Sequence, residues 1–242
     1  MSGHSKWAQI KRQKAKTDAA RGKAFSRAAR EIIVAVRQGG TPTIEANLRL
    51  RMAVEAARAI NMPMENIKRA IERASGAGEG NYEELTYEGY GPGGVAVVVD
   101  AMTPNRKRTA ADVRYIFDRH GGNLGETGCV GWMFHKKGLI LLDEAENRRS
   151  EDDIMLLALD AGAEDLKKDD TYSVTTAAED LDRVKQALVK AGLKIESAEV
   201  TKIPTTMVEL DEEQAEKAIR LLEALEENDD VQNVYSNLEV KE

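Results

Sequence analysis

The sequence predicts an α+β protein: an N-terminal three-helix bundle with a basic arm, then two ferredoxin-like α/β domains, one inserted in the other. Three observations support this prediction. The chain has 242 residues, which exceeds the usual size of a single domain. Apolar residues recur at helical spacing up to about residue 75, whereas strand-like apolar runs appear beyond it. The later segments form one complete β-α-β-β-α-β set between two halves of another.

Three amphipathic helices make up the predicted bundle. The first runs from Lys23 to the paired Gly39 and Gly40, and its apolar stripe is Phe25, Ala28, Ala29, Ile32, Ile33 and Val36. The second starts near Pro42, ends before Pro63, and runs through Leu48, Met52, Ala56, Ala59 and Ile60. The third follows at once and ends at a glycine-rich linker, 76–80, with a stripe of Ile67, Ala70, Ile71 and Ala74.

The discontinuous α/β domain is predicted from segments on either side of the insert. Its first half contains a buried strand at 95–99, a helix over NRKRTAADVRYIFDRHGG and a strand CVGWMF. Its second half contains the strand TTMVEL, a helix from Glu212 to about Glu227 and the strand VQNVYSNLEV. Because neither half is complete alone, we expect both to belong to one domain, 81–136 plus 204–242.

The segment between these halves forms a complete set by itself. It contains a strand KKGLILLDE, a helix SEDDIMLLALDAG with Ser150 as its N-cap, and two strands within AEDLKKDDTYSVTTA. The helix AEDLDRVKQALVKAG and the strand LKIESAEVTKI complete it. The predicted domains are therefore 1–80, the discontinuous 81–136 plus 204–242, and the inserted 137–203.

Charge is distributed unevenly along the chain. Residues 1–80 hold 16 Lys and Arg against 7 Asp and Glu, a net charge of +9, whereas the remainder carries −16. Such asymmetry favours an anionic partner for the basic part, most often nucleic acid and less often a membrane surface. A solvated helical face is the alternative interpretation.

The basic arm is the first candidate nucleic-acid site. Few apolar residues occur before Arg21, so we expect a segment that becomes ordered on a polyanion. The cations expected to hold phosphates are Lys6, Lys11, Arg12, Lys14, Lys16, Arg21 and Lys23, with Arg27 and Arg30 on the first helix. Trp7 has two interpretations, which are stacking on a base and pinning the arm to the bundle.

A second basic cluster is Asn105, Arg106, Lys107 and Arg108 at the start of a predicted helix. The helix dipole disfavours cations there, but the unpaired backbone N–H groups favour anions. A phosphate docked at this helix would explain the cluster, and an exposed basic turn is the alternative.

Enzymatic and metal sites receive little support. The run GYGPGG leads into a strand, unlike nucleotide-binding glycine loops, and a tight turn explains it better than close approach to RNA. Cys129 and His135 lie about 20 Å apart on one strand, too far for direct proton transfer.

The acidic cluster Asp143, Glu144, Glu146, Glu151, Asp152 and Asp153 lacks the spacing of a calcium loop, so a solvated surface is the better interpretation. We expect no cofactor, metal or small-molecule substrate.

Four motifs in order resemble the YebC family, whose mitochondrial relatives include a translational activator of cytochrome c oxidase: GHSKWAQIK, NMPMENIKRAIERASG, YEGYGPGGVA and NRKRTAADVRYIFDRHGGNLGETGCVGWMF. The chain departs from the family pattern at Met64, Lys107 and Cys129, where family members often have Lys, Asn and Ser. The resemblance implies three domains, with the last inserted in the middle one. It also implies either a DNA-binding transcriptional regulator or a ribosome-associated translation factor that acts at proline-rich stretches.

The sequence therefore predicts a cytoplasmic, non-enzymatic regulator of gene expression that binds DNA or ribosomal RNA. It shows neither a helix-turn-helix with a polar recognition helix nor an aromatic pair typical of RNA-binding sheets. We therefore expect recognition of the backbone and shape of the nucleic acid. The competing class is a protein–protein adaptor that uses the acidic α/β half. Neither a secretory signal nor a membrane span is expected.

Overall fold

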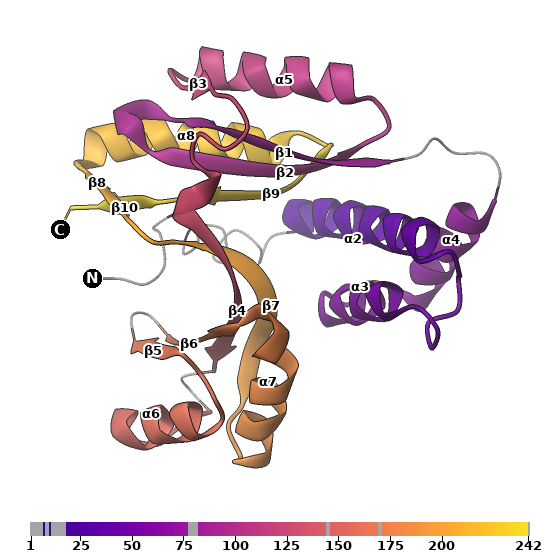
Figure 1. Cartoon of the computed structure of the whole chain (residues 1–242), viewed down its shortest axis with the longest axis vertical. Coiled ribbons are helices and arrows are strands. Elements are labelled where there is room, and N and C mark those ends of the chain that lie inside the picture. The colour runs from indigo at the N-terminus through magenta and orange to yellow at the C-terminus, as the bar shows by residue number, and fades with distance from the viewer. Residues whose placement is uncertain are drawn as a thin grey trace. The chain divides into compact units, whose positions relative to one another are not determined.

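The computed structural model describes Trp7, Ile10 and residues 18–76, 82–143, 146–168 and 171–241 (Figure 1). The chain forms two compact units. The first unit is Val130–Val208, and the second combines the chain from Trp7 to Cys129 with the chain from Glu209 onward. The α+β class is confirmed, because N-terminal helices are followed by antiparallel sheets.

The N-terminal helices are α2 (Asp18–Gly39), α3 (Leu48–Ala59) and α4 (Met64–Ser75). Their shared core contains the apolar residues predicted for the first and third helices. The stripe predicted for the second helix was wrong, since Leu48 is 65% exposed and Met52 is 48% exposed. The buried side chains of α3 are instead Leu50, Ala53, Val54 and Ala57. Both sets of residues have helical spacing, so apolar periodicity alone did not distinguish the buried face of α3 from its exposed face.

The predicted start of the second helix at Pro42 was also wrong, because Asn47 caps α3. Asn47 Oδ1 accepts a hydrogen bond from the backbone N–H of Leu50 at 3.0 Å. Asn47 Nδ2 donates to the carbonyl oxygens of Ala35 at 2.8 Å and Thr41 at 3.1 Å. One buried side chain therefore sets the start of α3 and links it to α2.

The sheet of the second unit has the order β3-β1-β2-β9 and is antiparallel throughout. β2 (Ala96–Thr103) contains the buried run predicted at 95–99, and β9 (Val231–Ser236) lies within the last predicted strand. β1 (Glu83–Tyr90) was not predicted, because its sequence EELTYEGY is polar and half of it is exposed.

The predicted strand CVGWMF was wrong. The strand that pairs with β1 is the short β3 (Asn123–Leu124), and Gly131–Met133 form a 3-10 turn, η2. Glu88 explains part of this difference, since its carboxylate accepts a hydrogen bond from the backbone N–H of Gly128 at 2.9 Å. The chain before Cys129 is thereby held in a turn instead of extending as a strand.

The glycine loop is the tight turn between β1 and β2. It contains the 3-10 turn η1 (Pro92–Gly94), and Gly93 has a φ of +72°, in the region that favours glycine. A Cβ at Gly93 would lie 2.6 Å from the side chain of Leu210, so the position also lacks room. The loop joins two strands, which is not the context of a phosphate-binding glycine loop.

Helices α5 (Arg106–Arg119) and α8 (Glu212–Glu227) pack with this sheet and supply its large buried side chains. α5 buries Val113 and Phe117, and α8 buries Leu221, Leu222 and Leu225. The predicted strand TTMVEL contains β8 (Val208–Leu210), which pairs with β10 (Leu238–Val240) in a separate two-stranded sheet.

The first unit matches the β-α-β-β-α-β set predicted for the insert. Its sheet has the order β5-β6-β4-β7 and is antiparallel. Ser150 caps the first helix as predicted, because its hydroxyl accepts a hydrogen bond from the N–H of Asp153. The elements are β4 (Phe134–Leu142), α6 (Glu151–Asp160), β5 (Asp165–Lys168), β6 (Tyr172–Ala177), α7 (Leu181–Lys190) and β7 (Ile195–Pro204).

Candidate nucleic-acid interface

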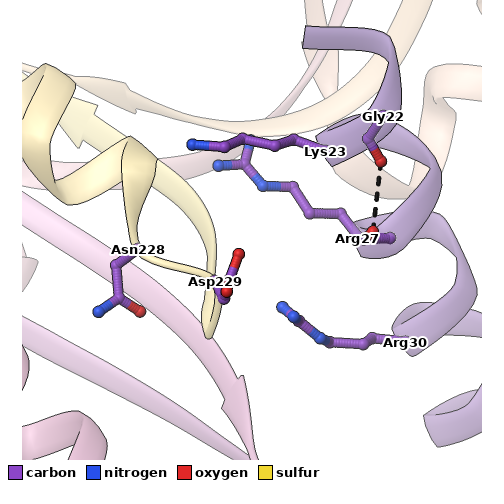
Figure 2. Close-up of a pocket in the computed structure, with 7 residues that line it drawn as sticks. Gly22, Lys23, Arg27, Arg30, Asn228 and Asp229 are labelled. Carbon is purple, nitrogen blue, oxygen red and sulfur yellow. Dashed lines mark hydrogen bonds between the residues drawn. The ribbon is translucent and has the colours of Figure 1, made fainter. Parts of the chain in front are cut away.

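Three of the cations predicted to hold phosphates share one face of α2. Lys23, Arg27 and Arg30 follow one another at spacings of four and three residues, which places them in one row along a helix. This row lies beside the turn from α8 to β9, and Asn228 and Asp229 of that turn line a cavity with it (Figure 2). We call residues 228–230 the acidic turn.

Arg27 connects α2 to the C-terminal end of α8. Its guanidinium forms an ion pair with the carboxylate of Glu226 at 2.7 Å. It also donates to the backbone carbonyls of Glu226 at 2.8 Å and Val231 at 3.1 Å. Lys23 Nζ donates to the carbonyl of Glu227 at 3.2 Å. The last turn of α8 has no basic residue of its own, so these cations complement the negative end of its dipole.

Arg30 differs from Arg27 because its guanidinium lacks a complete set of partners. Its Nη1 is buried and has no hydrogen-bond partner among the described residues. In Figure 2 the Arg30 side chain reaches from α2 toward Asp229 of the acidic turn. Arg30 therefore lines the cavity and keeps one unpartnered donor, which is itself buried in this conformation.

Trp7 is an anchor in this structure. Its side chain is 3% exposed, and its indole N–H donates to the carbonyl of Val234 in β9 at 3.0 Å. A ring buried in this way has no face open to a base. Of the two interpretations of Trp7, the geometry therefore favours pinning, and the attachment point is β9.

The second basic cluster lies at the start of α5, as predicted. Asn105 is the N-cap, and its side chain accepts a hydrogen bond from the backbone N–H of Arg108 at 3.2 Å. The guanidinium of Arg108 forms an ion pair with the carboxylate of Asp230 at 2.7 Å. The same carboxylate accepts hydrogen bonds from the hydroxyls of Thr109 at 2.7 Å and Thr103 at 3.1 Å. Arg108 is therefore tied to the acidic turn.

The pKa of Asp230 reflects this network. Burial by itself would raise the pKa of Asp230, but hydrogen bonds from Arg108, Thr109 and Thr103 and the charge of Arg108 outweigh it. The pKa of Asp230 consequently lies below its ordinary value of 3.8. The carboxylate is ionised at neutral pH and holds the first turn of α5 against β9.

Arg106 and Lys107 remain exposed at the start of α5. For the remaining candidate residues, the structure does not describe the side chains. Arg21 lies within α2, but its side chain is outside the described parts. The arm residues Lys6, Lys11, Arg12, Lys14 and Lys16 lie outside the described residues.

Sequence reasoning missed the acidic turn. Asp230 contacts Arg108 of α5, while Asp229 and Asn228 line the cavity beside α2. The two predicted basic clusters therefore lie on either side of one turn in the second unit. The run NDD directly after a helix was the available signal, because Asn and Asp favour turns and helix ends.

Comparisons with known proteins establish the family. A model described as the TACO1/YebC protein N-terminal domain matches residues 5–77, and one described as the TACO1/YebC second and third domain matches residues 82–238. The chain belongs to the TACO1/YebC family. Both basic clusters lie inside the matched regions, α2 in the first and α5 in the second.

Relatives within the TACO1/YebC family align along the whole chain. A probable transcriptional regulatory protein of Pelotomaculum thermopropionicum is 57% identical over 100% of both chains. One of Desulforamulus reducens, with the same description, is 53% identical over 99% of both. The crystal structure of a conserved hypothetical protein from Aquifex aeolicus has 49% identity and a TM-score of 0.82, with 94% of each chain covered.

The described residues were compared with the requirements of a membrane span and of a metal site. Among the described residues, no helix is long and apolar enough to cross a membrane. In the same residues, no group of three or more His, Cys, Asp or Glu side chains is arranged to hold a metal ion.

Proposed function

We propose that this TACO1/YebC protein is a non-enzymatic, cytoplasmic regulator of gene expression that binds nucleic acid through its phosphate backbone. The observation that carries this proposal is the position of the two basic clusters beside the acidic turn. A single polyanion lying across this turn would meet Lys23 and Arg30 on one side and Arg106 and Lys107 on the other. Nucleic acid is the common cellular polyanion that presents phosphates in such a row.

We divide the predicted contact residues into positioning residues and phosphate-binding residues according to the contacts that their side chains make. Trp7, Arg27 and Arg108 hold elements of the second unit together, so we assign them to positioning. Lys23, Arg30, Arg106 and Lys107 are assigned to phosphates. The arm cations, from Lys6 to Arg21, keep the phosphate-binding role expected from their sequence, and they would extend the same contact.

Two lines of support bear on the class of nucleic acid, one favouring DNA and the other RNA. The names of the bacterial relatives indicate transcription, and hence DNA. The resemblance to translation factors indicates ribosomal RNA and action at proline-rich stretches. Because the proposed contacts are Lys and Arg side chains directed at phosphates, they suit either a duplex or a structured RNA.

Crosslinking in cells, followed by sequencing of all attached DNA and RNA, tests this proposal. Crosslinks concentrated in ribosomal RNA, and lost when residues 1–21 are deleted, would make the protein a translation factor. Enrichment at discrete promoters would make it a transcriptional regulator. Recovery of neither DNA nor RNA would overturn the proposal and leave the adaptor that uses the acidic half as the competing class.

A further inference from the structure

We propose that the cavity between α2 and the acidic turn is a binding site for one phosphate group, with Arg30 and Lys23 as its ligands and Asp229 as its resident competitor. This inference rests on the proposed function in one respect, since it locates one phosphate of the bound nucleic acid. The cavity has a volume of about 110 Å³ and is lined by Gly22, Lys23, Ser26, Arg27, Arg30, Asn228 and Asp229.

The cavity has the size and access that a phosphate needs. Its volume is several times the ~10–15 Å³ that a single water requires. Gly22, Lys23 and Ser26 are exposed, so the cavity opens to solvent along α2. A phosphate of a nucleic acid on the surface could therefore enter without rearrangement of the core.

The charge of the cavity favours an anion. The charge of Arg27 is neutralised by Glu226 at 2.7 Å. Its guanidinium also donates to two backbone carbonyls, so we do not count it among the phosphate ligands. The remaining charges are those of Lys23 and Arg30 against the single carboxylate of Asp229. Two cations therefore face one resident anion, which leaves an excess positive charge in the cavity.

The donors of the two proposed ligands are not all in use. Arg30 lines the cavity, and its Nη1 is buried without a partner among the described residues, so phosphate binding requires the guanidinium to turn this donor toward the cavity. Lys23 Nζ makes a hydrogen bond to the carbonyl of Glu227, and an ammonium group has three donors. A phosphate oxygen is a strong acceptor for both groups.

Asp229 allows a test that distinguishes this site from ordinary surface charge. Figure 2 shows its side chain facing Arg30 across the cavity. An entering phosphate must overcome repulsion from this carboxylate. Removing the charge of Asp229 should therefore strengthen phosphate binding, whereas removing that of Arg30 should weaken it.

The experiment measures binding of inorganic phosphate to the full chain by calorimetry, for the wild type and the variants Arg30→Gln, Asp229→Asn and Arg69→Gln. Arg69 is an exposed cation of α4, so its variant is matched in net charge to Arg30→Gln. We expect about tenfold weaker binding for Arg30→Gln, several-fold tighter binding for Asp229→Asn and no change for Arg69→Gln. Equal affinity in Arg30→Gln and Arg69→Gln would overturn the site.

The same variants, titrated with single-stranded RNA bearing a 5′-phosphate or a 5′-hydroxyl, identify the source of the phosphate. Tighter binding of the 5′-phosphate RNA that disappears in Arg30→Gln indicates a terminal monophosphate. Equal binding of both RNAs, weakened in Arg30→Gln, indicates a backbone phosphodiester. Arg30-dependent binding of inorganic phosphate by a protein that binds no nucleic acid would support the site and refute only the proposed function.

Asp229→Asn keeps the test valid if Arg30→Gln fails to fold. Its substitution lies in an exposed part of the acidic turn and removes no hydrogen bond that holds α5. Unchanged or weaker phosphate binding in a folded Asp229→Asn protein, verified by circular dichroism, would contradict the proposal.

Discussion

Asp230 shows how one residue can hold together the elements of the proposed binding surface. Its carboxylate receives the guanidinium of Arg108 and the hydroxyls of Thr103 and Thr109. This arrangement places Asn105 and the first turn of α5 against β9, and it leaves Arg106 and Lys107 exposed. The basic cluster at α5 therefore divides into one cation that positions the helix and two that remain available to phosphates.

Asp230→Asn should lower the free energy of unfolding at neutral pH by about 2 kcal/mol, because it weakens a buried, charge-assisted network. The lowered pKa of Asp230 also fixes the sign of the pH effect. The ionised carboxylate stabilises the fold above its ordinary pKa of 3.8, and this contribution is lost as the pH falls through the lower pKa of the folded state. Urea unfolding between about pH 5 and pH 2 should thus show a flatter pH dependence for the variant.

Asp229→Asn is the control for this measurement. It removes a neighbouring carboxylate that is not bonded to Thr103 or Thr109. If Asp230→Asn and the wild type show parallel pH dependence over the acid range, the network is not the source of the low pKa.

At the scale of elements, apolar periodicity carried most of the correct prediction. The order of strands and helices in the insert was predicted because they have strong, regular patterns and Ser150 marks a helix start. β1 was missed because a strand with one exposed face and several glutamates lacks an apolar run. The second helix was assigned the wrong face because apolar residues lie on both of its faces, so periodicity alone could not choose between them.

The candidate site was less predictable than the fold. Cations are visible in a sequence, but their partners are not. Asp230 lies 122 positions from Arg108, and the Glu226 carbonyl lies 199 positions from Arg27. Such pairs form only when the C-terminal helix and strand join the sheet, so no local pattern reveals which cations are internal.

The cap of α3 provides a test at the scale of elements. Asn47→Ala should lower the free energy of unfolding by about 2 kcal/mol, because α3 loses its N-cap acceptor and the carbonyls of Ala35 in α2 and Thr41 after it each lose a hydrogen bond. Asn47→Asp keeps the acceptor but has no N–H to donate to Ala35 and Thr41. Thermal or urea unfolding should show a lower free energy of unfolding in both variants. A free energy equal to that of the wild type in Asn47→Asp would mean that the hydrogen bonds donated by Asn47 contribute nothing to stability.

At the scale of the whole molecule, the uneven distribution of charge affects how a polyanion approaches the protein. The chain has a net charge of −7, yet its first 80 residues carry +9. A polyanion should therefore be attracted to one end of the chain and repelled by the rest, which makes the orientation of binding depend on ionic strength. The three-domain division, with the boundaries predicted from the sequence, remains part of our proposal.

Replacing Lys11, Lys14 and Lys16 together by Glu should weaken nucleic-acid binding strongly and flatten its salt dependence. Fewer counterions are released from the nucleic acid, so the slope of log K against log salt should fall in magnitude by about 2 to 3. Fluorescence anisotropy at several salt concentrations measures this slope. The matched control replaces Lys185, Lys190 and Lys194 by Glu, with the same change in net charge. A slope in the arm variant equal to that of the control would refute the role of the arm.

The contact between Trp7 and Val234 has a consequence for how the protein is made. The two residues are 227 positions apart, so at about 5–20 residues per second a ribosome needs roughly 10 to 45 s to synthesise the second after the first. In the later part of that interval, once β2 has been synthesised, it has no β9 beside it, and its run of valines presents an unpaired edge. The inserted unit, by contrast, can complete its sheet as soon as β7 leaves the exit tunnel. We therefore expect the nascent chain to expose this edge until its last strand has been synthesised.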